Sequence, residues 1–286
     1  MEVFGTVASA LSVAALFNNC VSCFEYIQLG RHFGRDYELH QLKLDIAQIR
    51  LSRWGQAVAV NDDPRFVTLN PQDKDFRKAQ LILGAIFKLF GTLEDASEMY
   101  KIDAEPEDLE LLQIQDMKPP AQKLHRMFSA IANKRKKGTS FLKKAAWALY
   151  DGKNFNKLVG ELMGLIDGLE KLFPVEAATR AMVEMEIEEI QEDESSLRAL
   201  QSAATDTDGV LSEVVTARLE KCEQHNYAKN IQSEEKARVR VGNEWTNSCG
   251  VRPAGSTRNE SDSVAAKGSS AVHIGNSYGG RGVFDG

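Results

Sequence analysis

The sequence predicts an all-α globular N-terminal domain followed by a tail that is disordered in the soluble state and forms a β-solenoid when assembled. Residues 1–222 are rich in Leu, Ala, Glu and Lys, whereas residues 223–286 hold nearly half of the 21 glycines. Apolar residues recur at helical spacing in the first part. In the second part, one strand-like phrase occurs twice, 33 residues apart.

The chain starts with an apolar segment, residues 3–24, that contains no charged side chain. As a helix of about 22 residues it would extend about 33 Å, close to the hydrocarbon thickness of a bilayer. Asn18 and Asn19 dilute its hydrophobicity, so it suits a protein core as well as lipid. Glu2 precedes it where a secretory signal would carry Lys or Arg, so secretion is not expected. A membrane role would depend on Val3, Phe4, Val7, Leu11, Val13, Leu16 and Phe17.

Several helices follow the apolar segment. Leu, Ile and Trp at helical spacing predict a helix over 37–60, which ends at Asn-Asp-Asp-Pro. A similar pattern covers 73–101, and Pro119-Pro120 is placed to begin a helix that runs to about residue 137. We expect further helices at 139–151, 154–173, 175–192 and 196–222.

Charge and motifs exclude several functions. The net charge of −6 and the pI near 5.5 give no reason to expect nucleic acid as a partner. One basic run, residues 134–137 with Lys143 and Lys144, suits either a solvated helix end or an anionic membrane surface. Cys20 and Cys23 lack the partners of a zinc or redox site, so reduced thiols and no cofactor are expected. No catalytic motif is present, and we expect no enzyme.

The tail repeats itself at an offset of 33 residues, giving pseudo-repeats at 226–246 and 259–279. Two aligned pairs reverse their charge, Lys229 with Asp262 and Glu234 with Lys267. If aligned residues lie about 4.8 Å apart in parallel stacked strands, opposite charges attract where identical ones would repel. Identical asparagines can instead donate to one rung and accept from the next. The Asn ladders predicted in this way are Asn226 with Asn259 and Asn243 with Asn276.

Alternation within the repeats separates an inner face from an outer face. Gly242 and Gly275 supply the corner after each strand. Two rungs are too few to bury their faces, so further rungs would come from other molecules in a fibril. A chance similarity and a lone hairpin are the alternatives. The inner, amyloid-core residues predicted are Ile231, Ala237, Val239, Val241, Val264, Val272 and Ile274.

With both ends described, the chain resembles the HET-s/HET-S proteins of filamentous fungi, the prion and killer pair of heterokaryon incompatibility. The resemblance spans the whole chain and rests on long runs, among them FNNCVSCFEYIQLGRHFGRDYE at 17–38, RLSRWGQAV at 50–58, AWALYDGK at 146–153 and the ending IGNSYGGRGVFDG. It implies a HeLo-like helical bundle over 1–222 and a prion-forming domain over 223–286.

The resemblance also implies a function. In that family an amyloid seed templates the tail, the HeLo domain deforms, and its apolar N-terminal segment permeabilises a membrane. The partners implied are the chain itself as an amyloid homopolymer, a prion-form allelic partner or a NOD-like receptor with a matching motif, and membrane lipid after activation. The location implied is cytoplasmic when soluble and the cell membrane after activation.

Some positions depart from the family or bear on toxicity. Lys236 aligns with Ser269, so a third opposite-charge pair of the family is missing. Phe284 occupies the region where the family places an aromatic after the second repeat.

His32 bears on whether the protein is toxic. A proline at this position would cost about 3 kcal/mol inside a helix, whereas histidine lets the segment continue. We therefore expect a protein that is able to kill. A non-toxic prion allele and a helical adaptor with a flexible binding tail remain the alternatives.

Overall fold

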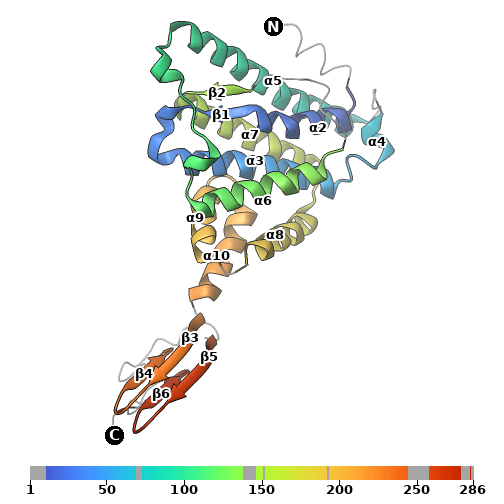
Figure 1. Ribbon diagram of the computed structural model, residues 1–286. Helices are drawn as coiled ribbons and strands as arrows, with labels where there is room; N and C mark the ends of the chain where they lie inside the picture. Colours follow the sequence, from blue (N-terminus) through green and yellow to red (C-terminus); the bar gives the residue numbers. More distant parts are fainter. Residues whose placement is uncertain are drawn as a thin grey trace, which may run out of the picture. The chain divides into compact units, whose positions relative to one another are not determined.

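The computed structural model describes residues 11–68, 73–137, 146–150, 152–191, 193–223, 225–243, 258–277 and residue 284. The chain divides into two compact units, residues 1–215 and residues 216–286. Helices dominate the first unit, and the second contains two pairs of parallel strands (Figure 1). The boundary falls inside helix α10 (Gly209–Glu223), a few residues before the change of composition.

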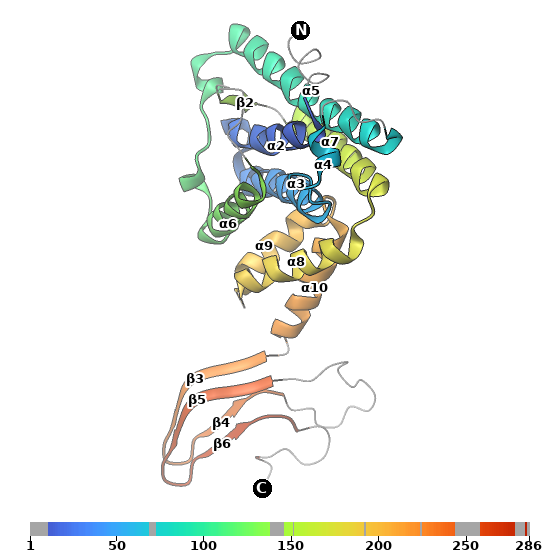
Figure 2. The same cartoon turned by 90° about the vertical axis from the view of Figure 1, so that its right-hand side faces the viewer.

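Helix α3 (Tyr37–Ala57) is the central element of the first unit. Its side chains Ile46, Ile49 and Trp54 are completely buried. A helix that is buried on most of its faces needs neighbours on several sides, and Figure 2 shows α3 among the surrounding helices. Its helical neighbours include α2 (Val13–Cys23), α6 (Pro119–Arg135), α7 (Gly152–Leu172), α8 (Glu176–Ile190) and α9 (Glu194–Ala204).

Helices α4 (Pro64–Val67) and α5 (Lys74–Asp103) pack against helix α2 of the apolar segment. Helix α5 also packs against α7. Its N-cap is Asp73, whose Oδ1 accepts a hydrogen bond from the backbone N–H of Asp75 at 2.7 Å and so stabilises the first turn. Helix α4 is one turn. Among the described residues, 3₁₀ helices lie at Phe24–Tyr26, Arg31–Asp36, Pro106–Leu109 and Ile114–Asp116.

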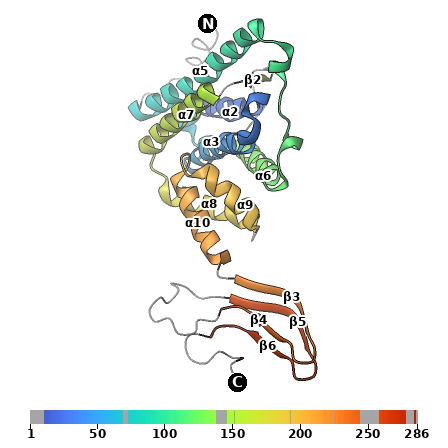
Figure 3. The same ribbon diagram turned by 90° about the vertical axis from the view of Figure 1, so that its left-hand side faces the viewer.

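The predicted helices at 37–60, 73–101, 119–137, 154–173 and 175–192 are confirmed as α3, α5, α6, α7 and α8. Their ends differ from the predictions by a few residues, because the last turns of a helix fray and a sequence pattern does not fix them. Helices α8 and α9 lie on one side of α3, which Figure 3 shows from a second direction.

The helix predicted over 139–151 is wrong at its C-terminal end. Residues 138–145 lie outside the described residues, and Trp147–Leu149 form strand β2. This strand pairs in parallel with β1 (Ile27–Leu29), with Leu29 opposite Leu149. Both strands are short and mostly buried, so long-range pairing has outweighed the local preference for helix.

The single helix predicted over 196–222 is also wrong, because it is two helices. A turn at residues 205–208 separates α9 from α10. Oδ1 of Asp208 accepts a hydrogen bond from Leu211 N at 3.0 Å, and the backbone carbonyl of Asp208 accepts one from Ser212 N at 2.9 Å. These bonds make Asp208 the N-cap of α10. The dipeptide Asp208-Gly209 is typical of turns, and the prediction of one continuous helix overlooked it.

In the described part of the apolar segment, residues 13–23 form helix α2. Residues 3–10 lie outside the described residues, and α2 begins at Val13 after the N-cap Ser12, whose Oγ accepts from Ala15 N at 3.2 Å. The helix has 11 residues and is about 16 Å long. Within the described ranges no helix combines the length and the apolar character that a membrane crossing requires.

The second unit contains strands β3 (His225–Ser233), β4 (Arg238–Val241), β5 (Arg258–Ala266) and β6 (Ala271–Ile274). Strand β3 pairs in parallel with β5, and β4 pairs in parallel with β6 (Figures 2 and 3). Asn226 lies opposite Asn259, and Val239 lies opposite Val272. Both ladders therefore have the 33-residue register of the sequence repeat, and each repeat forms one rung of a two-rung stack.

Candidate functional site: the stacked repeats and the apolar segment

The backbone joins the two rungs beyond the strands themselves. Lys267 N donates to Ser233 O at 2.8 Å, Ala271 N to Ala237 O at 2.9 Å, and Gly275 N to Val241 O at 3.1 Å. Each of these bonds has a donor 34 residues after its acceptor, the spacing of a parallel ladder in the 33-residue register. The connecting arcs therefore stack in the same way as the strands.

The predicted core residues differ in burial. Ile231 is 5% exposed, and its partner Val264 is 47% exposed. A stack of only two rungs leaves a face of each rung uncovered, which accounts for apolar side chains that remain accessible. Ser233, absent from the predicted core, is 2% exposed, and its carbonyl oxygen accepts from Ser270 Oγ at 3.1 Å. Val239, Val241, Val272 and Ile274 are half-buried, and Ala237 is exposed.

The four ladder asparagines form one connected set. Asn226 Nδ2 donates to Asn259 Oδ1 in the next rung at 2.9 Å, and also to Asn243 Oδ1 in its own rung at 3.0 Å. Asn259 Nδ2 donates to Asn276 Oδ1 at 2.9 Å within the second rung. The first predicted ladder is thus a direct bond between rungs. Asn243 and Asn276 instead join the corner of each rung to its first strand.

Of the two predicted charge pairs, the structure brings one together, Glu234 with Lys267. Lys267 Nζ lies 3.8 Å from Glu234 Oε1, and both side chains are exposed. In the described part of the chain Lys229 makes no ion pair with Asp262. Asp262 accepts a hydrogen bond from the Tyr227 hydroxyl, which raises the pKa of Tyr227. The sequence missed Tyr227 because an aromatic on an exposed strand has no charge signature.

Two backbone corners shape each rung. Gly242 and Gly275, the predicted turns, have φ of +108° and +130°. A Cβ on Gly242 would also lie 2.7 Å from Asn259 Cγ, so a side chain there would collide with the asparagine bond between rungs. A second corner was not predicted. Glu235 and Gly268, which the repeat aligns, have φ of +57° and +69°, and only the second has the residue that this conformation favours.

Phe284 covers the outer side of the second strand pair. The guanidinium groups of Arg238 and Arg240 lie 5.8 Å and 5.3 Å from the centre of its ring. The ring of His273 meets it edge-on at 6.4 Å. The outward-facing cations of β4 are therefore placed over an aromatic ring, a favourable contact.

The described part of the apolar segment is buried in the first unit. Val13, Leu16 and Phe17 are fully buried, and Leu11 is half-buried. A Cβ on Gly55 of α3 would overlap the Phe17 ring, so only glycine allows this close approach. Val3, Phe4 and Val7 lie outside the described residues.

Polar side chains of this segment are bonded to the fold. Asn18 Nδ2 donates to Asn61 Oδ1 at 2.6 Å, and Asn18 Oδ1 accepts from Lys137 N at 2.8 Å. Lys136 Nζ donates to Ser22 Oγ at 3.2 Å and to Glu25 Oε1 at 2.8 Å. The end of the basic run thus holds α2 in place by hydrogen bonds and an ion pair. Lys143 and Lys144 lie outside the described residues.

His32 does not lie in a continuing α-helix, so that prediction is wrong. It occupies the first turn of the 3₁₀ helix Arg31–Asp36, and Gly34 interrupts that helix with φ +45°. His32 Nε2 lies 3.3 Å from Asp108 Oδ1, and both side chains are about half exposed. The helix-interior cost of proline therefore does not apply at this position.

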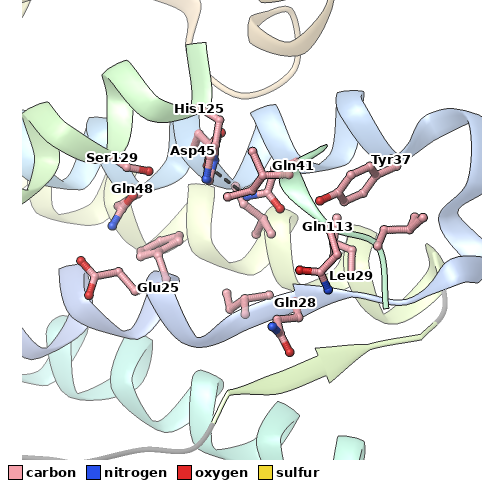
Figure 4. Close-up of a pocket in the computed structure, with 15 residues that line it drawn as sticks. Glu25, Gln28, Leu29, Tyr37, Gln41, Asp45, Gln48, Gln113, His125 and Ser129 are labelled. Atoms are coloured by element: carbon pink, nitrogen blue, oxygen red, sulfur yellow. Dashed lines mark hydrogen bonds and ion pairs between the residues drawn. The ribbon is translucent and has the colours of Figure 1, made fainter. Parts of the chain in front are cut away.

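A pocket of about 260 Å³ lies between α3, α6 and β1 (Figure 4). His125 Nδ1 lies 2.9 Å and 3.0 Å from the two carboxylate oxygens of Asp45. Burial lowers the pKa of His125, but the hydrogen bond and charge of Asp45 outweigh it and raise the pKa overall. Burial, with Asp116 and Asp45, raises the pKa of Tyr37 to about 12, so its hydroxyl stays neutral. The contact between His125 and Asp45 joins α6 to α3.

Family models match both units of the chain. One, named HeLo and described as "Prion-inhibition and propagation", matches residues 5–200. A second, described as "Het-s 218-289", matches residues 218–279. Heterokaryon incompatibility protein s of Podospora anserina is 48% identical over 287 residues, which cover 99% of each chain. The chain belongs to the HET-s/HET-S family.

Other members of the HET-s/HET-S family are similar to this chain in sequence and in fold. Heterokaryon incompatibility protein S of Podospora anserina strain S is 47% identical, again over 99% of each chain. The solved HET-S N-terminal domain has a TM-score of 0.73 and 50% identity, covering 77% of this chain and 99% of that one. A mutant HET-s N-terminal domain has a TM-score of 0.71 and 49% identity, covering 73% and 99%. The helical unit therefore has the HeLo fold, and the segment that matches the "Het-s 218-289" model follows it.

Proposed function

We propose that this chain is an amyloid-triggered cell-death effector of heterokaryon incompatibility, and that it acts without catalysis. The observation that carries the proposal is the pairing of the two repeats in one register, with the Asn226–Asn259 bond between rungs. A chain that can stack its own repeats can stack the equivalent repeats of another copy by the same bonds. Before templating, the tail is disordered and the protein cytoplasmic.

Templating starts at an open face of the stack. The apolar side chain of Val264 is accessible there, and an incoming rung would bury it. The seed is amyloid of this chain, a prion-form allelic partner, or a NOD-like receptor with a matching motif. Ordered growth then requires the turn at Gly242, whose φ and crowding exclude other residues.

The toxic step is release of the apolar segment. In the helical unit Asn18 and Ser22 are bonded to Asn61, Lys137 and Lys136, and Phe17 is fully buried. These bonds favour the folded state, because in lipid the same polar groups would lose their partners. Once the fold around α2 is disturbed, residues 3–24 are long enough as a helix to enter the membrane. Membrane lipid is then the final partner.

The test uses the full chain, fibrils of its tail, and liposomes that contain a dye. Wild-type protein should join the fibrils and release the dye only when seeded. Gly242→Ala should do neither, because a Cβ strains the corner and meets Asn259. Gly160→Ala is the matched control, since Gly160 lies in α7 with open space around it, and it should behave as wild type.

The other outcomes distinguish the alternatives. Wild-type protein that joins fibrils but releases no dye in any lipid, and that leaves seeded cells alive, would be a non-toxic prion allele. Wild-type protein that does not join fibrils would be a helical adaptor with a binding tail. Either result would reject the proposed function.

A further inference from the structure

Four charged side chains form a buried ion-pair cluster, defined as Arg53, Arg135, Glu186 and Asp208. Arg53 Nε lies 3.2 Å from Glu186 Oε2, and Arg53 Nη2 lies 2.7 Å from Asp208 Oδ2. Arg135 Nη1 lies 2.8 Å from Glu186 Oε1. The side chains of Arg53, Glu186 and Asp208 are no more than 3% exposed. The cluster joins α3, α6 and α8 to the turn between α9 and α10.

Asp208 has two functions in this turn. Its Oδ1 caps α10 by accepting from Leu211 N, while its Oδ2 faces Arg53. Arg50, one helical turn before Arg53, donates from Nη1 to the carbonyl of Thr207 at 3.2 Å. Two arginines of α3 therefore hold the residues from which α10 starts, and α10 ends at Glu223, two residues before β3 begins.

The ion-pair cluster is incompletely satisfied. Arg53 Nη1 is buried and has no hydrogen-bond partner among the described residues, and the contacts of Nε and Nη2 are close but poorly aligned for hydrogen bonding. An arginine cannot release its proton to escape burial. Removing one carboxylate from a buried arginine is therefore strongly destabilising, far more than removing an exposed pair.

Arg53 is adjacent in sequence to the residues that hold the apolar segment. Trp54 and Gly55 follow it in α3, the Phe17 ring lies 6.2 Å from the Trp54 ring, and Phe17 also occupies the space beside Gly55. A shift of α3 at Arg53 would therefore disturb the contact that keeps α2 buried.

We propose that Asp208 is the positioning residue that couples α10 to the burial of the apolar segment. This inference rests on the proposed function. When templated growth of the tail draws α10 out of its place, Asp208 leaves Arg53, and the buried guanidinium keeps only Glu186, which it shares with Arg135. The uncompensated positive charge destabilises α3, and α2 loses its packing. The coupling thus passes from Asp208 through Arg53 to Phe17.

The test compares two Asp→Asn variants of the full chain. Asp208→Asn keeps an N-cap oxygen for α10 and removes the charge opposite Arg53. It should lower the Tm of the helical unit by about 10 °C and lower the amount of seed needed for half-maximal dye release by about tenfold. Asp206→Asn is the control, because Asp206 is 80% exposed and lies 4.0 Å from Lys43. It should change neither quantity.

A second variant tests whether the uncompensated charge of Arg53 causes the effect of Asp208→Asn. Arg53→Met with Asp208→Asn removes both charges, leaves Glu186 paired with Arg135, and should return the Tm and the seed requirement toward wild type. Equal seed requirements for Asp208→Asn and Asp206→Asn would overturn the inference. So would a double variant that needs as little seed as Asp208→Asn.

Hydrogen exchange separates this inference from the proposed function. In seeded wild-type protein the amides of α10 and of α3 near Arg53 should lose protection together, whether or not liposomes leak. Absence of leakage with joint loss of protection would reject the toxic function and support the coupling. Loss of protection in α10 while α3 stays fully protected would reject the coupling.

Discussion

Replacing Asn226 by alanine removes a side-chain hydrogen bond between the two rungs, the one to Asn259. Asn226 Nδ2 donates to both Asn259 and Asn243, so two hydrogen bonds are lost with every molecule that stacks. At about 1 kcal/mol for each bond, addition of a molecule should be weaker by about 2 kcal/mol. Because 1.4 kcal/mol is a factor of ten, this corresponds to about a 30-fold change in equilibrium.

The assay is the concentration of full-length protein that remains soluble after growth on seeds has reached equilibrium. Asn226→Ala should raise it about 30-fold. Gln232→Ala is the control, because Gln232 lies in the same strand with an exposed side chain, and it should leave this concentration within about a factor of two. An unchanged solubility for Asn226→Ala, or equal effects of the two variants, would refute the asparagine contact as a source of stacking energy.

Three further predictions concern the second corner, the N-terminus and pH. Glu235 has a left-handed backbone conformation, which costs a non-glycine residue about 1–2 kcal/mol, whereas glycine adds an entropy cost of about 0.5–1 kcal/mol. Glu235→Gly should therefore lower the concentration of protein that stays soluble after seeded growth by about threefold. A rise in this concentration would contradict the prediction. Deleting residues 2–10 should leave seeded fibril growth intact and abolish dye release, provided circular dichroism shows the helices; undiminished release would exclude this segment. The pKa of His125 is raised in the folded protein, because Asp45 favours the protonated imidazole. The contact with Asp45 therefore contributes its full stabilisation of the fold below the unfolded pKa of about 6.5, and this contribution is lost as the pH rises through the folded pKa. The Tm advantage over Asp45→Asn should therefore shrink above pH 6.5, and a pH-independent difference would show that His125 stays neutral.

The periodic features of the sequence predicted the pairing of the tail repeats and most of the helices. The register of the tail followed from the 33-residue offset, since parallel stacking keeps equivalent residues opposite each other. The helices with a long apolar periodicity were also predicted correctly. Strand β2 was missed because its partner β1 lies over a hundred residues earlier, and three residues carry no period of their own.

Polar contacts were the least predictable part. Asn18 lowers the hydrophobicity of the apolar segment. In the fold, however, its side-chain amide donates to Asn61 and accepts from Lys137. The partner of Asp262 is a tyrosine, which a search for opposite charges cannot find. No sequence pattern marks Arg53 as part of a cluster, because only tertiary packing brings Glu186 and Asp208 around it.

The constant register of the rungs gives the stack a polarity. Since both ladders are parallel, one end of a molecule presents the first repeat and the other end presents the second. Head-to-tail addition sets a second repeat against a first one again, which brings the charges of Lys267 and Glu234 together at every junction, as within one molecule. The two ends of a fibril are consequently different surfaces, and a foreign segment that imitates only one repeat finds its complement at one end alone.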